Sequence, residues 1–370
     1  MKTWSRTATV LLVCAAAVMS VRAHQHKYAP SAYSILTPLI QNNLTIFPVV
    51  TNSTHDTHMF LTLDQGIRSG QVVVAEEGSG AGLVRPRRSW NERSPQEILP
   101  PRGGAEVNRL TLTNNSERPL LLLAGEIVTG GKQDRVVGKD RIIDARSGPV
   151  DLGVFCVEPH RWTGASSHFG ALGFSMAQPS VRSKAMADKD QNAVWDEVAK
   201  SKTAVAMLAP APAAAALSGT SSYAAAMQNR FVQDQVNSVA GPVERSYDKL
   251  LGDLRAQHAV GAVVAVNGEI LWADTFASPA LFEAYWPKLV RSYAAEAVAA
   301  RTVPARILKP PSLVDARAFL EDWNARSETA ESEPHVYRNT ELTGDDFKLF
   351  ILTALLPGTD FNVHIAKMRE

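Results

Sequence analysis

The sequence predicts an α+β fold with a β-rich N-terminal half, a helical middle and a mixed C-terminal part that contains β-hairpins. Three observations predict it. Residues 107–157 form a succession of short apolar runs separated by Gly, Asn and Ser, which is typical of strands and tight turns. Residues 181–201 and 223–257 instead carry apolar side chains at helical spacing. After them, Asn267-Gly268 between two apolar runs is the strongest short-range signal for a hairpin.

The N-terminal half is expected to begin with strands in 35–40 and 44–47, which turn at Asn42-Asn43. A helix is predicted within 59–67, ending before Gly70, and a strand within 71–75. Residues 76–104 are rich in Gly, Pro, Arg and Glu and read as an exposed loop. The continuous apolar run 120–124 predicts a strand that is covered on both faces.

The middle and the end of the chain predict helices first and then strands. The first half of the Ala/Pro-rich tract 203–226 predicts a flexible connection, and 223–257 predicts one helix or two joined near Gly241-Pro242. Ser278 and Ser312 are expected to cap helices over 279–300 and 313–326. Strands follow near 335–340, 347–355 and 361–367. Residues 24–370 thus predict a single α+β domain, or two subdomains joined by a linker near 203–222.

The first residues have the pattern of a signal peptide. Lys2 and Arg6 precede the apolar run 10–19, which is shorter than the ~20 residues of a membrane span. Cleavage is expected after Ala23, because Val13 does not suit the position before a lipoprotein cysteine at Cys14. The sequence therefore predicts a soluble protein exported to the periplasm or the medium, with no membrane span.

The composition argues against nucleic-acid binding and against an internal disulfide. Export would remove three of the 38 Lys and Arg residues and no acidic residue, which leaves 35 basic against 37 acidic side chains. A near-neutral chain of this kind lacks the electrostatic footprint of a nucleic-acid-binding protein. Of the two cysteines, only Cys156 would remain, so no internal disulfide can form and stability must come from a hydrophobic core.

Residues 125–135 predict a polar site next to a buried strand. The chain passes from the apolar run through Glu126 and two glycines into Lys132, Gln133, Asp134 and Arg135. Glycines permit close approach of a ligand to the backbone, and Lys132 with Arg135 can hold an anion. The spacing is not that of a nucleotide phosphate loop, since five residues separate Gly125 from Gly131 and Gln133 follows the lysine. The alternative interpretation is a hairpin turn with a solvated, charged tip.

Residues 154–162 are the second candidate segment. Period-two alternation places Cys156 and Glu158 on one face of a strand, followed by His160, Arg161 and Trp162. A Cys156–His160 nucleophilic pair is disfavoured, because four residues of extended chain span about 13 Å and hydrogen bonding needs about 3 Å. Glu158 and Arg161 can orient a ligand or form a structural ion pair, and a lone cysteine is commonly an inert core residue.

Histidines suggest two metal hypotheses, neither of which has a full set of ligands. His55 and His58 flank a short turn, but the sequence names no third ligand for a zinc-like site. After cleavage at Ala23, His24 and His26 would lie at the new terminus, where amine, amides and imidazole suit Cu(II) or Ni(II). No metal site is therefore predicted, and the sequence specifies no cofactor.

The two candidate segments together resemble a known family. Gly125-Glu126, residues 130–135, residues 155–158 and Arg161-Trp162 are similar to the domain named for its association with ADP-ribosylglycohydrolases and rhodanese-phosphatases. Further similarity lies in 61–70, Val194-Trp195, 276–293 and 363–365, so the resemblance covers most of the chain after residue 23. The family's name records the proteins it accompanies. It implies an ADP-ribose-like or other phosphorylated ligand, and it assigns no site residues.

The leading hypothesis is an exported protein that binds a small polar, anionic or phosphorylated ligand. The predicted ligand-binding residues are those of the two candidate segments: Glu126, Lys132, Gln133, Asp134, Arg135, Cys156, Glu158, Arg161 and Trp162. Two other classes remain open. One is a hydrolase or transferase with Cys156 as its nucleophile, and the other is a structural or interaction protein of the cell envelope.

Overall fold

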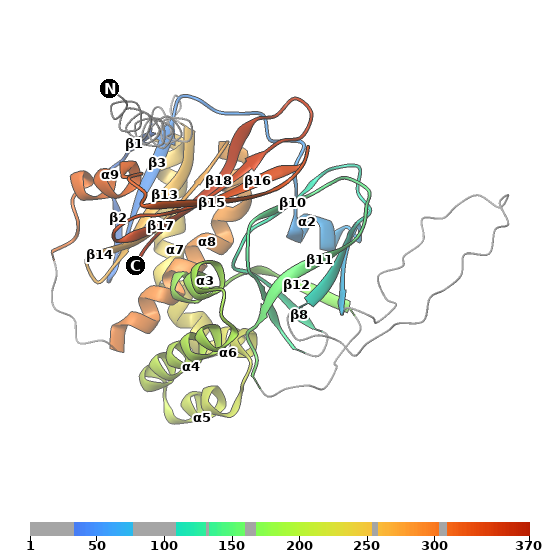
Figure 1. The fold of residues 1–370 in the computed structure, drawn as a ribbon. Helices are drawn as coiled ribbons and strands as arrows, with labels where there is room; N and C mark the ends of the chain where they lie inside the picture. The colour runs from blue at the N-terminus through green and yellow to red at the C-terminus, as the bar shows by residue number, and fades with distance from the viewer. Residues whose placement is uncertain (1–32, 77–108, 131–132, 160–167, 254–257, 303–308) are drawn as a thin grey trace, which may run out of the picture.

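The computed structural model describes residues 33–76, 109–130, 133–159, 168–253, 258–302 and 309–370 (Figure 1). Its strands build a nine-stranded antiparallel sheet, a closed six-stranded barrel and a small three-stranded sheet within these residues. Helices pack on the large sheet and between it and the barrel. The predicted α+β class is confirmed. None of the described helices is long and apolar enough to cross a membrane.

The large sheet joins the two ends of the chain. Its order is β1-β3-β13-β14-β18-β17-β16-β15, with β2 paired to β3. The strands are β1 (Tyr33–Ile35), β2 (Leu39–Gln41), β3 (Leu44–Thr51), β13 (His258–Val266), β14 (Glu269–Phe276), β15 (Ser327–Glu333), β16 (Tyr337–Thr343), β17 (Phe347–Ala354) and β18 (Phe361–Arg369). The predicted hairpin joins β13 to β14: Asn267 and Gly268 have φ values of 52° and 86°, as a type I′ turn requires.

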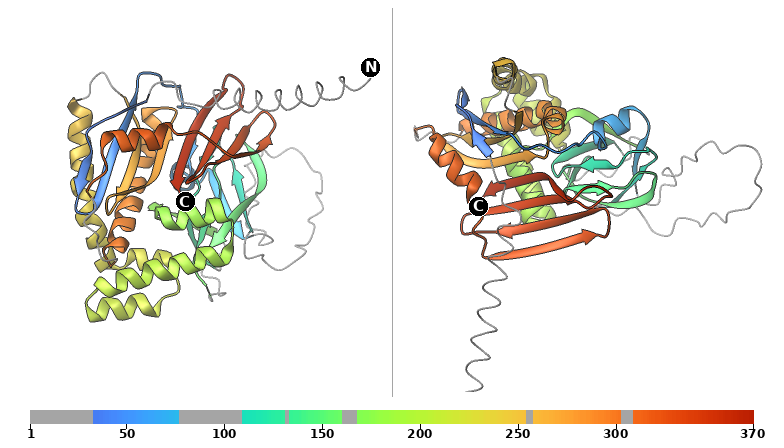
Figure 2. Two further views of the ribbon diagram at one scale, coloured as in Figure 1. Left: turned by 60° about the vertical axis from the view of Figure 1, so that its left-hand side comes forward. Right: turned by 90° about the horizontal axis from the view of Figure 1, so that it is seen from above.

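Both faces of this sheet are covered, as Figure 2 shows from two sides. Helix α8 (Pro279–Ala299) packs with α7 (Arg230–Asp253) on one face, and α9 (Leu313–Glu321) packs on the other. Alternation along β13 explains this arrangement, because Val264 belongs to the core beneath α8 whereas Val263 belongs to the core beneath α9. Ser278 and Ser312 cap α8 and α9 as predicted.

The barrel has the order β11-β6-β5-β12-β8-β9. Its strands are β5 (Val72–Glu76), β6 (Arg109–Asn114), β8 (Glu126–Gly130), β9 (Arg135–Val137), β11 (Ser147–Cys156) and β12 (His168–Met176). Val74, Leu112, Val128, Val137 and Val154 contribute to one apolar cluster. Beside the barrel lie β4 (Leu61–Thr62), β7 (Leu120–Leu122), β10 (Arg141–Ile143) and α2 (Leu63–Arg68).

The middle of the chain differs from the sequence-based expectation. The predicted helix 181–201 is divided into α3 (Pro179–Ser183), a π-helical turn (Lys184–Asp188) and α4 (Gln191–Leu208). The first half of the tract 203–226 was expected to be a flexible connection, and this expectation is wrong: α4 continues to Leu208 and α5 (Ala211–Gly219) follows. Alanine has the highest helix propensity, and proline is tolerated in the first turn of α5, so the tract favours helix.

Two further boundaries differ. Residues 223–257 were expected to form one helix or two joined near Gly241-Pro242. The structure has two, but they are divided at Asn229, between α6 (Tyr223–Gln228) and α7, and Pro242 lies inside α7. Strand β15 (Ser327–Glu333) was not predicted, because its sequence Ser-Glu-Thr-Ala-Glu-Ser-Glu has no apolar alternation. It is exposed along its whole length at the edge of the large sheet. The expected signal peptide and most of the loop 76–104 lie outside the described residues.

Candidate functional site

Arg135 points into the barrel at one end. Residues directly opposite each other in paired strands share a face, and Arg135 is opposite Val128 on β8 and Cys156 on β11. Val128 and Val137 both belong to the apolar cluster inside the barrel, so the side chain of Arg135 lies on the inner face. Val136, between them, packs outward against the helices. A long cation therefore occupies a place where apolar side chains are the rule.

The guanidinium of Arg135 is incompletely bonded. The residue is 0% exposed, yet within the described part of the chain the only hydrogen bond of its side chain is from Nη1 to the carbonyl of Asp134, at 3.4 Å. Nε and Nη2 are buried without a hydrogen-bond partner. Burial lowers the pKa of Arg135, opposed by electrostatic interactions with Cys156, Glu76 and Asp134. Buried charged groups normally form hydrogen bonds or ion pairs. Without them the free-energy cost of removing the ion from water, about several kcal/mol, is not compensated.

Four more residues surround Arg135, and together the five are termed the Arg135 cluster: Gln133, Asp134, Arg135, Cys156 and Glu158. Nε2 of Gln133 donates to the carbonyl of Glu158 at 2.8 Å, and the amide of Asp134 donates to the Glu158 carboxylate at 3.3 Å. The Asp134 carboxylate accepts from the hydroxyl of Ser222 at 2.7 Å. Oε1 of Gln133 is buried without a partner. The two candidate segments of the sequence are therefore in contact. Residues 133–135 are buried, so the alternative interpretation of a solvated, charged turn is wrong for them.

Cys156 is a neutral thiol in this setting. It is fully buried, its Sγ donates to the carbonyl of Glu158 at 3.3 Å, and it accepts from the Glu158 amide at 3.4 Å. Burial raises the pKa of Cys156, although the backbone hydrogen bond and the charge of Arg135 act in the opposite direction. Because the thiolate is the nucleophilic form, this environment disfavours the hypothesis of cysteine catalysis.

We expect Cys156 to resist alkylation in the native protein. A variant Cys14→Ser, in which Cys156 is the sole thiol, should react with iodoacetamide at pH 7.5 only at the rate at which the chain opens, and fully in urea. Mass spectrometry of the peptide around Cys156 measures the labelled fraction. Rapid native labelling that rises with pH would support a reactive thiol instead.

Glu126 lies in a different cluster from Arg135. Its carboxylate pairs with Nζ of Lys288 at 2.6 Å and accepts from the Leu123 amide at 2.8 Å, and Lys288 also pairs with Asp64 at 2.7 Å. Burial raises the pKa of Glu126, which Lys288 opposes. These contacts join β8 of the barrel to α8 and α2, so the structure does not bring Glu126 to the predicted ligand. Lys132, Arg161 and Trp162 lie outside the described residues.

A second buried network, which we term the seam network, joins the barrel to the large sheet: Asp140, Arg182, Asp274, Tyr293 and His364. Arg182 donates to both oxygens of Asp274 at 3.0 Å. His364 bonds Asp140 through Nδ1 at 2.6 Å and Asp274 through Nε2 at 3.1 Å. Burial by itself lowers the pKa of His364, but the two carboxylates outweigh it and raise the pKa to about 9.

The seam network is saturated, unlike the Arg135 cluster. Nε of Arg182 donates to the carbonyl of Ala124, and Tyr293 donates its hydroxyl to Asp274. The Asp140 carboxylate also accepts from the Ala124 amide at 2.7 Å. Every charged group of the seam network has a protein partner, so we interpret the network as structural. None of its members was among the predicted site residues, although Asp274 and His364 are ionisable residues inside apolar strands, which is a signal of buried, paired charge.

The charged His364 gives the protein a predictable pH dependence. Its folded-state pKa of about 9 exceeds the ordinary value of 6.5, so the folded protein binds the extra proton between these values. Stability should be greatest below pH 6.5 and fall as the pH rises, with a slope approaching about 1.4 kcal/mol per pH unit. His364→Gln should remove this slope in urea denaturation between pH 6.5 and 8. Above that range Lys367, whose pKa burial lowers to about 8, contributes a slope of opposite sign. Equal slopes in wild type and variant would mean that His364 is neutral.

His55 and His58, the pair considered for metal binding, lie near another histidine and a glutamate. His55 and His58 line a cavity of about 370 Å³ together with His258 of β13 and Glu283 of α8. Across the described part of the chain, no three His, Cys, Asp or Glu side chains are placed to hold a metal ion. His24 and His26 lie outside the described residues.

The fold and the cluster define an α+β protein in which a small closed barrel, with an unsatisfied arginine inside, is fused to a large antiparallel sheet. Residues 32–366 match the family model described as the ARG and Rhodanese-Phosphatase-superfamily-associated Protein domain, ARPP-1. The chain belongs to this family, as the candidate segments had suggested. No curated protein and no solved structure matches the chain.

Proposed function

We propose that the protein binds a small polar ligand at the end of the barrel, with the oxyanion of the ligand on Arg135. The main support for this proposal is that two donors of a fully buried guanidinium, Nε and Nη2 of Arg135, have no hydrogen-bond partner among the described residues. These two nitrogens lie on the same edge of the guanidinium and form a fork that matches two oxygens of a carboxylate or a phosphoryl group. Two bonds to a ligand would offset the cost of burying the charge.

The contrast with Arg182 supports a ligand rather than a structural role. Both arginines are fully buried, but Arg182 has all three nitrogens bonded to Asp274 and Ala124, whereas Arg135 lacks such partners. Oε1 of Gln133 adds an unused acceptor that suits an N–H or O–H of the ligand. The family membership is consistent with an ADP-ribose-like or other phosphorylated molecule. The N-terminal pattern Lys2 to Ala23 supports export, which we include in the proposal.

Thermal-shift measurements test the proposal. We would screen ADP-ribose, sugar phosphates and sugar carboxylates, and expect a hit to stabilise the protein by about 2.7 kcal/mol at a concentration of 100 Kd. Arg135→Met should abolish the stabilisation. Arg317→Met, which alters an exposed arginine of α9, should retain it. A hit whose effect survives Arg135→Met would show that the ligand binds elsewhere and would overturn the assignment of Arg135.

A further inference from the structure

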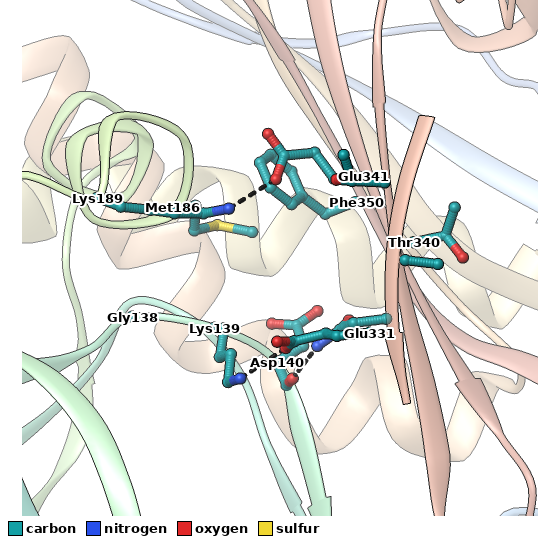
Figure 3. Close-up of a pocket in the computed structure, with 12 residues that line it drawn as sticks. Gly138, Lys139, Asp140, Met186, Lys189, Glu331, Thr340, Glu341 and Phe350 are labelled. Atoms are coloured by element: carbon teal, nitrogen blue, oxygen red, sulfur yellow. Dashed lines mark hydrogen bonds and ion pairs between the residues drawn. The ribbon is translucent and has the colours of Figure 1, made fainter. Parts of the chain in front are cut away.

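A cavity lies where the barrel meets the far edge of the large sheet, and we term it the seam pocket. Its volume is about 360 Å³. One wall is the face of β15, β16 and β17, and the other is the turn after β9 with the end of the π-helical turn (Figure 3). It is separate from the Arg135 cluster: Arg135 is the first residue of β9, whereas the pocket residue Gly138 follows the last residue of that strand.

Two ion pairs cross the seam pocket from wall to wall. Nζ of Lys139 lies 2.6 Å from Glu331, and Nζ of Lys189 lies 2.7 Å from Glu341. Figure 3 shows the two pairs on opposite sides of an open space. Between the walls, Nδ2 of Asn339 also donates to the carbonyl of Asp140 at 2.6 Å. These three contacts bridge the two walls.

The lining of the seam pocket is electrically balanced. Its two lysines are each matched by a glutamate, and the carboxylate of Asp140 is bonded to the charged His364 of the seam network. A ligand with a net charge would therefore find no unpaired counter-charge in these two pairs, so its charge would gain little from binding. The balance favours an uncharged ligand.

Two large apolar side chains contribute to the lining of the pocket. Met186, which is buried, and the ring of Phe350, which is partly buried, come from opposite walls. A thioether and an aromatic ring make favourable contacts with a flat π system. A volume of about 360 Å³ is at the lower end of the range for small-molecule sites, which favours a body of one or two rings.

From these features we infer that the seam pocket is a second binding site, for an uncharged, flat heteroaromatic compound that lies between Met186 and Phe350. Its polar edge faces Asn339 and the two ion pairs, which offer donors and acceptors together. Recognition here depends on shape and hydrogen bonding, in contrast to the anion fork of Arg135.

Three probes of similar size test the chemical class of the ligand by ligand-observed NMR: quinazolin-4-one, its saturated octahydro analogue, and quinoline-4-carboxylate. We expect quinazolin-4-one to bind at least about tenfold more tightly than either of the others, a difference of about 1.4 kcal/mol. The inference is overturned if the carboxylate or the saturated ring binds as well, or if quinazolin-4-one fails to bind at millimolar concentration.

Matched variants of β15 test the location. Thr329 is opposite Glu341 and lines the pocket, so Thr329→Trp should fill it and abolish binding of quinazolin-4-one. Ser332 is exposed on the opposite face of the same strand, and Ser332→Trp should leave binding unchanged. Both residues are exposed, so both variants should fold, which circular dichroism checks. Binding that survives Thr329→Trp overturns the assignment of the pocket.

Discussion

Replacing Asp274 by Asn should lower the free energy of unfolding by about 3–5 kcal/mol, the usual cost of removing one partner from a buried ion pair. Asp274 is fully buried and accepts from Arg182, Tyr293 and His364, so the amide would leave two buried cations without their shared counter-charge. The charge of Arg182 also holds the pKa of Asp274 far below its ordinary value, although burial alone would raise it. Urea denaturation followed by circular dichroism measures the change.

An exposed ion pair provides the control for this prediction. Glu117 and Arg146 pair on the surface, with side chains 74% and 68% exposed. Glu117→Gln should change the free energy of unfolding by less than about 1 kcal/mol, because water screens such a pair. If Asp274→Asn costs no more than Glu117→Gln, the seam network does not stabilise the fold.

Replacing Arg135 by Met should have the opposite effect and raise the stability of the ligand-free protein by about 1–3 kcal/mol. Methionine keeps much of the length of the side chain and removes a buried charge whose Nε and Nη2 have no hydrogen-bond partner within the described residues. A gain in stability on removal of a residue is typical of positions that serve binding rather than folding. Chemical denaturation without ligand measures it.

The same substitution at Arg182 is the matched control. Arg182→Met removes a guanidinium that is equally buried but fully bonded, and should cost about 3–5 kcal/mol. Opposite signs for the two variants are expected. Should Arg135→Met destabilise the protein as Arg182→Met does, Arg135 would be a structural residue and the proposed ligand fork would be refuted.

Local sequence patterns predicted most of the elements. The Asn267-Gly268 turn and the serine caps of α8 and α9 need only nearby residues for their formation. The short strands between 109 and 156 were recognised from their apolar runs and turn residues. Polar tracts were predicted less well. β15 has no apolar alternation, and it forms because all seven of its residues are in register with the neighbouring strand β16. The Ala/Pro-rich tract has high helix propensity, which outweighed its low complexity.

The candidate site was predicted in part, for a reason that follows from strand geometry. Residues 133–135 and 156–158 were recognised because polar residues interrupt apolar strands, and their meeting depends on the pairing of β9 with β11. Glu126 was assigned to the same site on proximity in sequence. It instead pairs with Lys288, which is 162 positions away in the chain. The position of Lys288 in the sequence gives no indication that it pairs with Glu126.

The α+β class, the hairpin at Asn267-Gly268, the helix caps and the polar character of two segments could all be predicted from the sequence. Turn chemistry and hydrophobic periodicity act between residues that are close in the chain, so local patterns are enough to recognise them. Only the tertiary structure decided which buried charges are satisfied. Closure of the barrel places Arg135 inside with two donors unbonded, whereas packing of the barrel against the sheet gives Arg182 all of its partners. Both arginines are fully buried, and what distinguishes them is their hydrogen bonding. The cost of desolvating each charge depends on the groups that surround it in the folded protein.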